Sequence, residues 1–447
     1  MGLARSGVAA ALALRREAPE ARIVACDRGR PPEAAEAEEG LGQAGVEVHL
    51  DTDGTELFAA DPPPRTVVKS PGVPAAAPAV TRARALGAEV VGELEIGWRL
   101  VPNELTAVTG TNGKTTTTEL IGAIHREAGL PVAVAGNVGT PVCAFAGVLD
   151  RAASVVCEAS SFQLEDSVDF APEVAVFLNF GEDHLDRHET AAAYLAAKLR
   201  VFANQRADDI AVLNDDDPAL GERDIPGAAQ RVWFGEGERC RMRLAGDHLE
   251  WDGRALVDVS SLALRGAHNV RNSMAAAAAT LARGVDPDAV RAALRSFRGV
   301  PHRLEEVAEV GGVLYVNDSK ATNVSSAVAA LRAYCGGVHA ILGGSLKGGG
   351  FAELAPAVEE CCARCYVIGE AADRLAADLG ETGVELVRCG DLERAFDEAS
   401  SRARPGETVL LAPACASFDQ YRDFEQRGDH FRSLVSALAA GEQEHPR

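Results

Sequence analysis

The chain has 447 residues, 47% of them hydrophobic, and a formal net charge of -22 at pH 7. This length and apolar content predict a multidomain protein with large buried cores. The acidic excess argues against nucleic acid and anionic membranes as main partners, and no run of about 18 apolar residues predicts a membrane span. The N-terminus lacks the basic and apolar segments of a signal peptide, so we expect a cytoplasmic protein.

Residues 1–92 alternate short apolar runs with helix-compatible stretches, which is typical of a parallel, Rossmann-like sheet. Strands are predicted at Arg22–Cys26, Val46–Leu50, Thr66–Lys69 and Glu89–Val91, and helices at Gly7–Glu17 and Glu33–Ala44. Asp27 follows a strand, where such folds often place an acid that contacts a ribose or base. The glycine turn at Gly2–Gly7 has no strand before it, so we expect the first strand of this domain to be missing.

Residues 93–299 are predicted to form a central domain with a parallel sheet of the P-loop ATPase type. Strands are expected at Ala107–Thr109, Val132–Ala135, Ser154–Cys157, Val174–Leu178 and Ile210–Leu213, and helices at Lys114–Glu127, Thr190–Ala203 and Asn269–Ala282. The turn-rich stretch Arg231–Val259 is expected to be a small β appendage.

The strongest motif of the chain is Gly110-Thr111-Asn112-Gly113-Lys114-Thr115-Thr116, between a predicted strand and a predicted helix. Glycines let backbone N–H groups approach phosphate oxygens, and the helix N-terminus and Lys114 add positive charge. A threonine hydroxyl at this place can reach Mg²⁺. The general pattern has a glycine where this chain has Val108, so a simple helix-capping turn is the alternative.

Polar residues follow two of the predicted central strands. Glu158 comes directly after Ser154–Cys157 and is suited to bind Mg²⁺, although a helix cap or a surface acid would have the same sequence. His184 lies in a polar segment after the next strand and could bind a metal or orient a carboxylate. Lys198, considered by itself, is expected to be an ordinary helix lysine.

Residues 300–447 are predicted to form a third, Rossmann-like α/β domain. Its strands are expected at Val313–Val316, Ala340–Leu342, Cys365–Ile368, Glu385–Arg388 and Thr408–Leu411. A polar segment, Asn317–Asn323, follows the first of these strands, and Lys347 lies in a glycine-rich loop after the second. Since ligands of open α/β sheets bind at the carboxyl ends of strands, these segments are candidates for recognising charged groups.

Taken together, the motifs resemble those of the Mur ligase family, over nearly the whole chain. The segments that carry the resemblance are Thr109–Thr116, Glu158–Leu164, Glu182–Arg187, His268–Asn272, Pro301–Arg303, Asn317–Asn323 and Ala414–Gln420. The resemblance implies an ATP-dependent ligase that makes an acyl phosphate. Asn317–Asn323 and Ala414–Gln420 resemble the glutamate-adding branch, which implies UDP-N-acetylmuramoyl-L-alanine and D-glutamate as substrates and a role in peptidoglycan precursor synthesis.

The resemblance also implies roles for individual residues. ATP would be held by Gly110, Thr111, Asn112, Gly113, Lys114, Thr115, Thr116, Asn269, Asn272, Arg303, Asp318 and Lys320. Two Mg²⁺ ions would be bound by Thr115, Glu158, His184 and a carbamate formed on Lys198. The muramoyl nucleotide would contact Asp27, Arg28, Ser70, Gly72 and Asn137, and the incoming glutamate would contact Thr322, Lys347, Ser417 and Phe424. The catalytic set implied is Lys114, Glu158, His184 and Lys198, in a monomer.

Two alternatives remain open from the sequence. One is a ligase like folylpolyglutamate synthetase, which also adds glutamate but has no equivalent of the domain at 1–92. The other is a nucleotide-binding paralogue without activity. The unusual start of the first domain is the reason for considering it. Within Gly344–Gly348, the residues before Lys347 differ from the family's pattern. This difference concerns the implied glutamate site, because Lys347 belongs to it.

Overall fold

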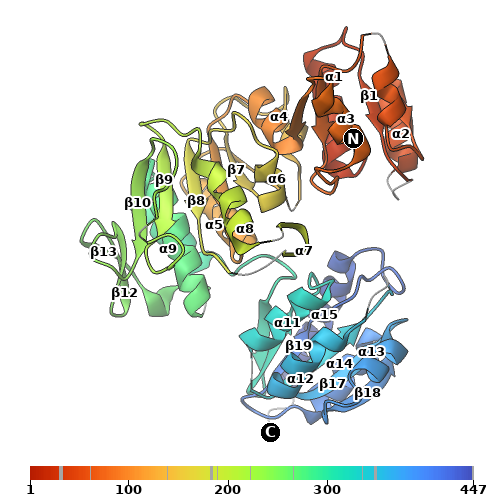
Figure 1. Cartoon of the computed structure of the whole chain (residues 1–447). Helices are drawn as coiled ribbons and strands as arrows, with labels where there is room; N and C mark the ends of the chain where they lie inside the picture. The colour runs from red at the N-terminus through yellow and green to blue at the C-terminus, as the bar shows by residue number, and fades with distance from the viewer. Residues whose placement is uncertain are drawn as a thin grey trace. The chain divides into compact units, whose positions relative to one another are not determined.

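The computed structural model describes the chain except for residues 30–33, 61, 138, 182–184, 189, 222, 265, 335, 347–349 and 445–447. The side chains of residues 34–37, 185, 186, 325 and 441–444 are also outside the description. The chain divides into two compact units, Met1–Phe297 and Arg298–Arg447 (Figure 1). Within the described residues, every helix is too short or too polar to cross a membrane.

The first 92 residues of unit 1 contain two separate pairs of parallel strands. The elements are α1 (Arg5–Glu17), β1 (Val24–Cys26), α2 (Ala34–Gln43), β2 (Glu47–His49), η1 (Thr55–Ala59), β3 (Thr66–Lys69), α3 (Pro78–Ala85) and β4 (Glu89–Gly92). β1 pairs with β2, and β3 pairs with β4. Met1 and Gly2 lie between the pairs: Gly2 N donates to Cys26 O at 2.9 Å, and Ser70 N donates to Met1 O at 2.9 Å.

The rest of unit 1 is built on a nine-stranded sheet in the order β13-β12-β11-β10-β9-β8-β5-β7-β6. The strands are β5 (Leu105–Thr109), β6 (Val132–Gly136), β7 (Ser154–Glu158), β8 (Val174–Phe177), β9 (Ile210–Asn214), β10 (Gln230–Gly235), β11 (Met242–Ala245), β12 (His248–Trp251) and β13 (Arg254–Asp258). The pairs from β6 to β11 are parallel, and β12 and β13 are added antiparallel.

Helices cover both faces of this sheet (Figure 1). They are α4 (Glu93–Leu100), α5 (Lys114–Glu127), η2 (Val142–Phe145), α6 (Ser161–Glu165), α7 (Leu185–His188), α8 (Ala191–Leu199), η3 (Arg200–Phe202), η4 (Val259–Ser261), α9 (Ala267–Ala282) and α10 (Pro287–Ser296). Leu94, Leu164 and Leu195 of α4, α6 and α8 belong to one buried apolar cluster. The opposite face is covered by α5, α9 and α10.

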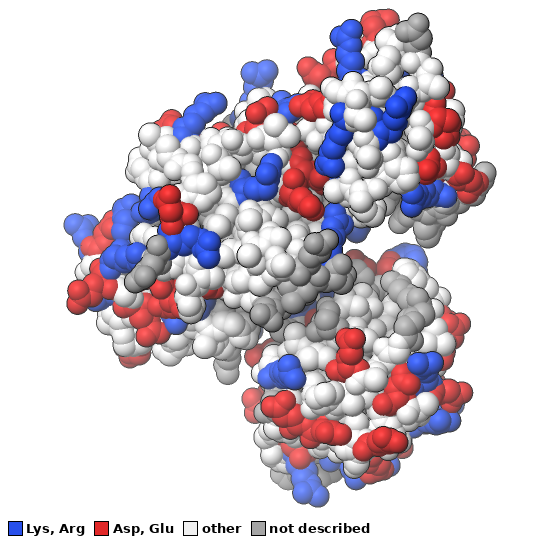
Figure 2. All heavy atoms as spheres, viewed as in Figure 1, with Lys and Arg blue, Asp and Glu red and all other residues white. Residues whose placement is uncertain are grey.

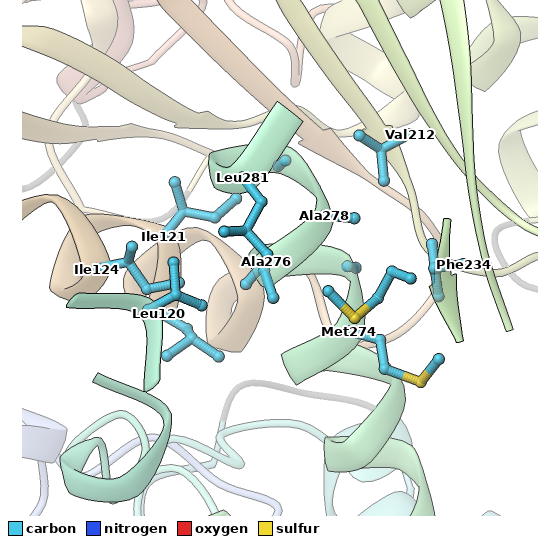
Figure 3. Close-up of a cluster of buried hydrophobic side chains, with 14 of the residues drawn as sticks. Leu120, Ile121, Ile124, Val212, Phe234, Met274, Ala276, Ala278 and Leu281 are labelled. Carbon is cyan, nitrogen blue, oxygen red and sulfur yellow. The ribbon is translucent and has the colours of Figure 1, made fainter. Parts of the chain in front are cut away.

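Alanines allow α9 to pack closely in the core on the sheet face that α5, α9 and α10 cover (Figure 3). Ala276 and Leu281 point toward Leu120 and Ile124 of α5, while Ala278 lies on the side of the strand residue Val212. Small side chains on α9 let a helix lie close to both a neighbouring helix and a sheet without leaving voids. This packing fixes α5, and with it the loop that precedes α5.

Unit 2 contains a six-stranded sheet in the order β14-β15-β19-β16-β17-β18. Its elements are β14 (Glu305–Val310), β15 (Val313–Asn317), α11 (Val324–Ala333), β16 (Val338–Gly343), η5 (Ala352–Leu354), α12 (Ala355–Cys361), β17 (Cys362–Ile368), α13 (Ala372–Asp378), β18 (Glu385–Gly390), α14 (Leu392–Arg402), β19 (Thr408–Leu411) and α15 (Phe424–Glu444). All strands are parallel except the edge strand β14.

The α/β class expected from the sequence is confirmed, with a correction in the central sheet. The stretch Arg231–Val259 is not an appendage, because β10 pairs in parallel with β9 and carries the central sheet on to β13. The Rossmann-like character of the outer domains and the boundaries at 92/93 and 299/300 stay predictions.

The surface carries both signs of charge. On the face shown in Figure 2, acidic and basic side chains are interspersed within each unit. Many of them form exposed ion pairs, such as Arg22 with Glu47 at 2.9 Å and Arg241 with Asp252 at 2.7 Å. Exposed pairs of this kind contribute about 0–1 kcal/mol each to the stability of the fold. Buried polar groups are better candidates for functional sites.

Candidate active site

The loop Gly110–Gly113 joins the buried strand β5 to α5. Gly113 is the N-cap of α5 with a φ of 84°, a left-handed conformation that glycine adopts without strain. Gly113 has no side chain with which to cap the helix. A helix N-terminus without a side-chain cap can bind phosphate through its free backbone N–H groups. Lys114 Nζ donates to the carbonyls of Gly110 at 3.0 Å and Thr111 at 2.8 Å, which holds the ammonium over the loop.

Asn179 fixes the conformation of this loop from the end of the neighbouring strand β8. Asn112 N donates to Asn179 Oδ1 at 2.9 Å, and Asn179 Nδ2 donates to Asn112 O at 3.1 Å. Thr111 N also donates to Asn179 O at 2.9 Å. The sequence indicated no role for Asn179, because pairing of a side-chain amide with a distant backbone leaves no local signature.

Glu158 lies directly beside the first turn of α5. Its carboxylate Oε2 accepts a hydrogen bond of 2.5 Å from Thr115 Oγ1, and its Oε1 accepts one of 3.2 Å from Asn137 Nδ2. Glu158 is only 3% exposed. Gly136 makes room for it: a Cβ at Gly136 would lie 2.2 Å from the carbonyl oxygen of Glu158.

These oxygen donors fit Mg²⁺. The ion prefers hard oxygens, few protein ligands and space for water and phosphate, and a threonine hydroxyl beside a carboxylate meets those needs. Among the described residues there is no group of three or more His, Cys, Asp and Glu that could hold a metal. A site with few protein ligands at Thr115 and Glu158 is compatible with that finding. His184, the other predicted metal ligand, lies outside the described residues.

Lys198 is buried against the phosphate loop, unlike the surface lysine that its local sequence predicts. It is 1% exposed, and its Nζ donates to Gly110 O at 2.6 Å. The ammonium also lies 4.5 Å from the centre of the Tyr194 ring, close enough for a cation–π contact. The structure therefore brings Lys198, Lys114 and Glu158 around the same loop.

Asn272 approaches the loop from α9. Its Nδ2 donates to Asn269 Oδ1 at 3.1 Å, so the two predicted adenine contacts touch one another. A Cβ at Gly113 would come within 2.2 Å of Asn272 Oδ1. Asn272 is therefore placed beside the phosphate loop. Burial lowers the pKa of the neighbouring His268.

A pocket of ≈ 490 Å³ lies at the ends of β1 and β3 in the first 92 residues. Four of the five residues predicted to contact the muramoyl nucleotide line it: Asp27, Arg28, Ser70 and Gly72. The fifth, Asn137, does not line this pocket and instead bonds Glu158. Asp27 accepts hydrogen bonds from Leu3 N at 2.6 Å and Gly29 N at 3.0 Å, so it also fixes the turns around the pocket.

The structure adds Thr52 and Asp53 to the lining of this pocket. They come just before Gly54, which marks a turn, but a turn motif by itself does not predict which pocket its residues line.

In unit 2, three residues predicted to bind ATP lie close together at the carboxyl end of β15: Arg303, Asp318 and Lys320. Lys320 N donates to His302 O at 3.0 Å, and Asp318 Oδ1 accepts from Leu304 N at 3.1 Å. Burial raises the pKa of Asp318 to about 6, against the lowering effects of the Leu304 hydrogen bond and of the charges on Arg303 and Lys320.

Arg427 connects the carboxyl ends of three strands of this sheet, β15, β16 and β19. The guanidinium, 1% exposed, donates to Ser319 Oγ at 3.0 Å and to the carbonyls of Ser319 at 2.9 Å, Cys415 at 3.1 Å, Ala416 at 3.2 Å and Gly343 at 3.4 Å. Burial lowers its pKa to about 10. The sequence did not single it out, because an arginine in a helix is usually a surface residue.

Two of the predicted glutamate contacts lie near Arg427. Ser417 is buried, and its hydroxyl makes no hydrogen bond within the described part of the chain. Ser319 Oγ donates to Phe424 O at 2.8 Å, which ties the start of α15 to the loop after β15. Thr322 follows in the same loop, where its N donates to Lys320 O at 2.8 Å. Lys347 lies outside the described residues.

The fold and the loop at Gly110–Thr116 define an α/β protein of the phosphate-binding-loop class. Comparison with known proteins narrows this class. Residues 108–280 match the Mur ligase middle domain, and residues 302–415 match the Mur ligase glutamate ligase domain. The chain belongs to the Mur ligase family.

Relatives of known name are similar along almost the full length. The UDP-N-acetylmuramoylalanine–D-glutamate ligase of Acidobacterium capsulatum is 40% identical over 448 residues, covering 98% of this chain and 95% of the relative. The enzyme of that name from Geobacter metallireducens is 41% identical over 451 residues, covering 99% and 98%.

Among solved structures, the UDP-N-acetylmuramate–alanine ligase of Thermotoga maritima has a TM-score of 0.56 at 20% identity, covering 97% of each chain. E. coli FolC in complex with DHPP and ADP has a TM-score of 0.53 at 19% identity, covering 77% of this chain and 92% of FolC. These similarities show the shared fold.

Proposed function

We propose that this protein is an ATP-dependent ligase that joins D-glutamate to UDP-N-acetylmuramoyl-L-alanine in peptidoglycan precursor synthesis. The nearly end-to-end identity of about 40% with D-glutamate ligases supports the choice of substrates. The geometry supports the use of ATP, and the observation that carries this part is the hydrogen bond between Thr115 and Glu158 at the head of the phosphate-loop helix.

The reaction proceeds in two steps. A carboxylate oxygen of the muramoyl substrate attacks the γ-phosphorus of ATP, so ADP leaves and an acyl phosphate forms. The amine of D-glutamate then attacks the acyl carbon, and inorganic phosphate leaves from the tetrahedral intermediate. The first step is needed because a carboxylate is a poor electrophile, and phosphorylation supplies a leaving group.

Residues of unit 1 stabilise the charge that moves in the first step. The N-terminus of α5 and the ammonium of Lys114 face the triphosphate and favour the negative charge on its oxygens. Thr115 and Glu158 would hold one Mg²⁺, with His184 contributing to a second. An Mg²⁺ ion held by these residues would supply positive charge that offsets the charge on the phosphate oxygens. Asn137 holds the Glu158 carboxylate in place.

Lys198 is proposed to carry a carbamate. A lysine that takes up CO₂ exchanges an ammonium for an anionic oxygen ligand, which suits a hard cation. The buried position of Lys198 beside the phosphate loop supports this role. Carbon NMR of protein exchanged with ¹³C-bicarbonate should give a carbamate signal that is absent from Lys198→Arg. A spectrum identical for both proteins would contradict the carbamate and leave the ligase proposal standing.

Each of the three segments is proposed to bind a different substrate. Residues 1–92 bind the UDP-muramoyl nucleotide in the pocket at Asp27, Arg28, Ser70 and Gly72, and residues 93–299 bind ATP with the help of Asn269 and Asn272. Residues 300–447 bind D-glutamate through Thr322, Lys347, Ser417 and Phe424, with Arg303, Asp318 and Lys320 directed to ATP. The buried Ser417 hydroxyl, which lacks a hydrogen bond within the described residues, supports a ligand there. The enzyme acts as a cytoplasmic monomer in this proposal.

Phosphate release from ATP tests the function. Purified full-length protein with Mg²⁺ should release phosphate only when both UDP-N-acetylmuramoyl-L-alanine and D-glutamate are present, and L-glutamate should not replace D-glutamate. Release with a folate substrate in place of the muramoyl nucleotide would instead support the folylpolyglutamate synthetase alternative. Binding of ATP without any turnover would support the inactive paralogue.

A further inference from the structure

A buried ion pair joins the substrate pocket of the first 92 residues to the central sheet. Lys69, the last residue of β3, is 0% exposed, and its ammonium contacts the carboxylate of Asp166, whose side chain is 3% exposed. Asp166 is the C-cap of α6, and its carbonyl accepts a hydrogen bond of 3.0 Å from Gly92 N at the end of β4. Breaking such a buried pair leaves an uncompensated charge, so its geometry is strongly enforced.

The same lysine holds the loop that forms one wall of the pocket. Lys69 Nζ donates to the carbonyl of Val73 at 2.9 Å, and Val73 N donates to Ser70 O at 2.9 Å. Residues 70–74 line the pocket of ≈ 490 Å³. The ammonium therefore bonds α6 on one side and the pocket loop on the other.

Arg187 makes a second connection between α6 and this loop. Its Nη1 donates to the carbonyl of Pro71 at 2.7 Å, which is also in the pocket wall. The guanidinium lies 4.1 Å from the centre of the Phe162 ring, and its Nη2 is 3.7 Å from Glu165 Oε2. Phe162 and Glu165 both belong to α6. This short helix therefore holds the pocket loop at two points, through Lys69 and through Arg187.

The other end of α6 is tied to the phosphate loop. α6 begins with a capping box formed by Ser160 and Gln163, two residues after Glu158. Glu158 in turn accepts the hydrogen bond from Thr115. A single segment from 158 to 166 thus contacts the ATP-binding helix at its start and the pocket loop at its end.

We propose that Lys69, Asp166 and Arg187 are positioning residues that set the place of the muramoyl nucleotide relative to the phosphate loop. This inference rests on the proposed function, because it takes the pocket at residues 70–74 as the nucleotide site. None of the three residues contacts the reacting atoms in this account. They act through the loop: when the loop shifts, the pocket wall no longer fits the nucleotide, so the affinity for the muramoyl substrate falls.

The test uses Asp166→Asn, Lys69→Met and Arg187→Lys in the full-length protein. Each should raise the KM for UDP-N-acetylmuramoyl-L-alanine by about tenfold or more, while the KM values for ATP and D-glutamate change by less than about twofold. Calorimetric titration of the muramoyl nucleotide should show the same loss of affinity without turnover. The matched control is Arg22→Gln, which breaks the exposed pair with Glu47 in the same segment and should leave all three KM values unchanged.

The outcomes separate this inference from the proposed function. Failure of the unaltered protein to bind the muramoyl nucleotide would refute the function itself. Normal binding by the unaltered protein, with variants that lose only kcat at constant KM, would overturn the positioning role, since a loss of folded molecules gives that pattern. If the two ion-pair variants do not fold, Arg187→Lys decides the matter, because it keeps the charge and alters a less buried group.

Discussion

The hydroxyl of Thr115, in the first turn of α5, donates a hydrogen bond of 2.5 Å to the carboxylate of Glu158 at the end of β7. The two residues are 43 positions apart in the sequence and meet because β7 pairs with β5 in parallel, so their carboxyl ends lie at the same edge of the sheet. This contact places two hard oxygens where a nucleotide's phosphates would bind.

The role of the Thr115 hydroxyl can be isolated by removing it. Thr115→Val should lower the rate of phosphate release by about a hundredfold, because a preorganised group at the transferring phosphate is lost. Thr117→Val is the matched control: Thr117 is buried in the same helix, and its hydroxyl has no hydrogen bond within the described residues. Equal losses in the two variants would show that helix packing is responsible.

Gly136 should be intolerant of any side chain. Its φ of 118° is strained for an L-residue, and a Cβ would overlap the backbone of Glu158 at 2.2 Å. We expect Gly136→Ala to lower the free energy of unfolding by about 3 kcal/mol and to displace Glu158. Gly139→Ala provides the comparison, since Gly139 has a φ of 88° but nothing within 4 Å of the added Cβ.

At Gly139 the loss should be about 1 kcal/mol, from backbone strain alone. Chemical denaturation of both variants measures the difference. Similar losses at the two positions would contradict the close approach at Glu158.

Asp318 should make stability depend on pH. Its pKa is raised to about 6 in the folded protein from 3.8, so the folded state binds more protons than the unfolded state between these values. The free energy of unfolding must therefore fall as the pH rises from 3.8 to about 6, by about 3 kcal/mol at most.

The carboxyl carbon of Asp318 should titrate by NMR near pH 6. Asp318→Asn should gain stability relative to the unaltered protein as the pH passes through this range, because an amide does not ionise. A stability difference that is independent of pH would show that the carboxyl titrates normally.

Arg427 should be irreplaceable by lysine. Its planar guanidinium serves acceptors at the carboxyl ends of three strands at once, whereas an ammonium cannot reach them all. We expect Arg427→Lys to destabilise unit 2 by about 3 kcal/mol and to raise the KM for D-glutamate. Arg422→Lys, at a side chain that is 82% exposed, should have little effect on either quantity. An unchanged KM for D-glutamate in Arg427→Lys would argue that the loops hold their form without it.

The sequence by itself determined the phosphate loop and its flanking elements. The helix predicted at Lys114–Glu127 has those bounds in the structure, and the strand before it ends at Thr109 as expected. These features are local: glycines favour the turn, apolar residues favour the strand, and the helix begins where the turn ends. The same locality made most strands of unit 2 predictable.

Only the tertiary structure decided which distant groups meet. The place of β10–β13 in the central sheet, the antiparallel β14, the burial of Lys198 against Gly110 and the contacts of Arg427 all depend on segments far apart in the chain. A buried lysine or arginine has the same sequence neighbourhood as an exposed one. What differs is the set of carbonyls and carboxylates that folding brings to it, and that set is fixed by strand pairing and helix packing.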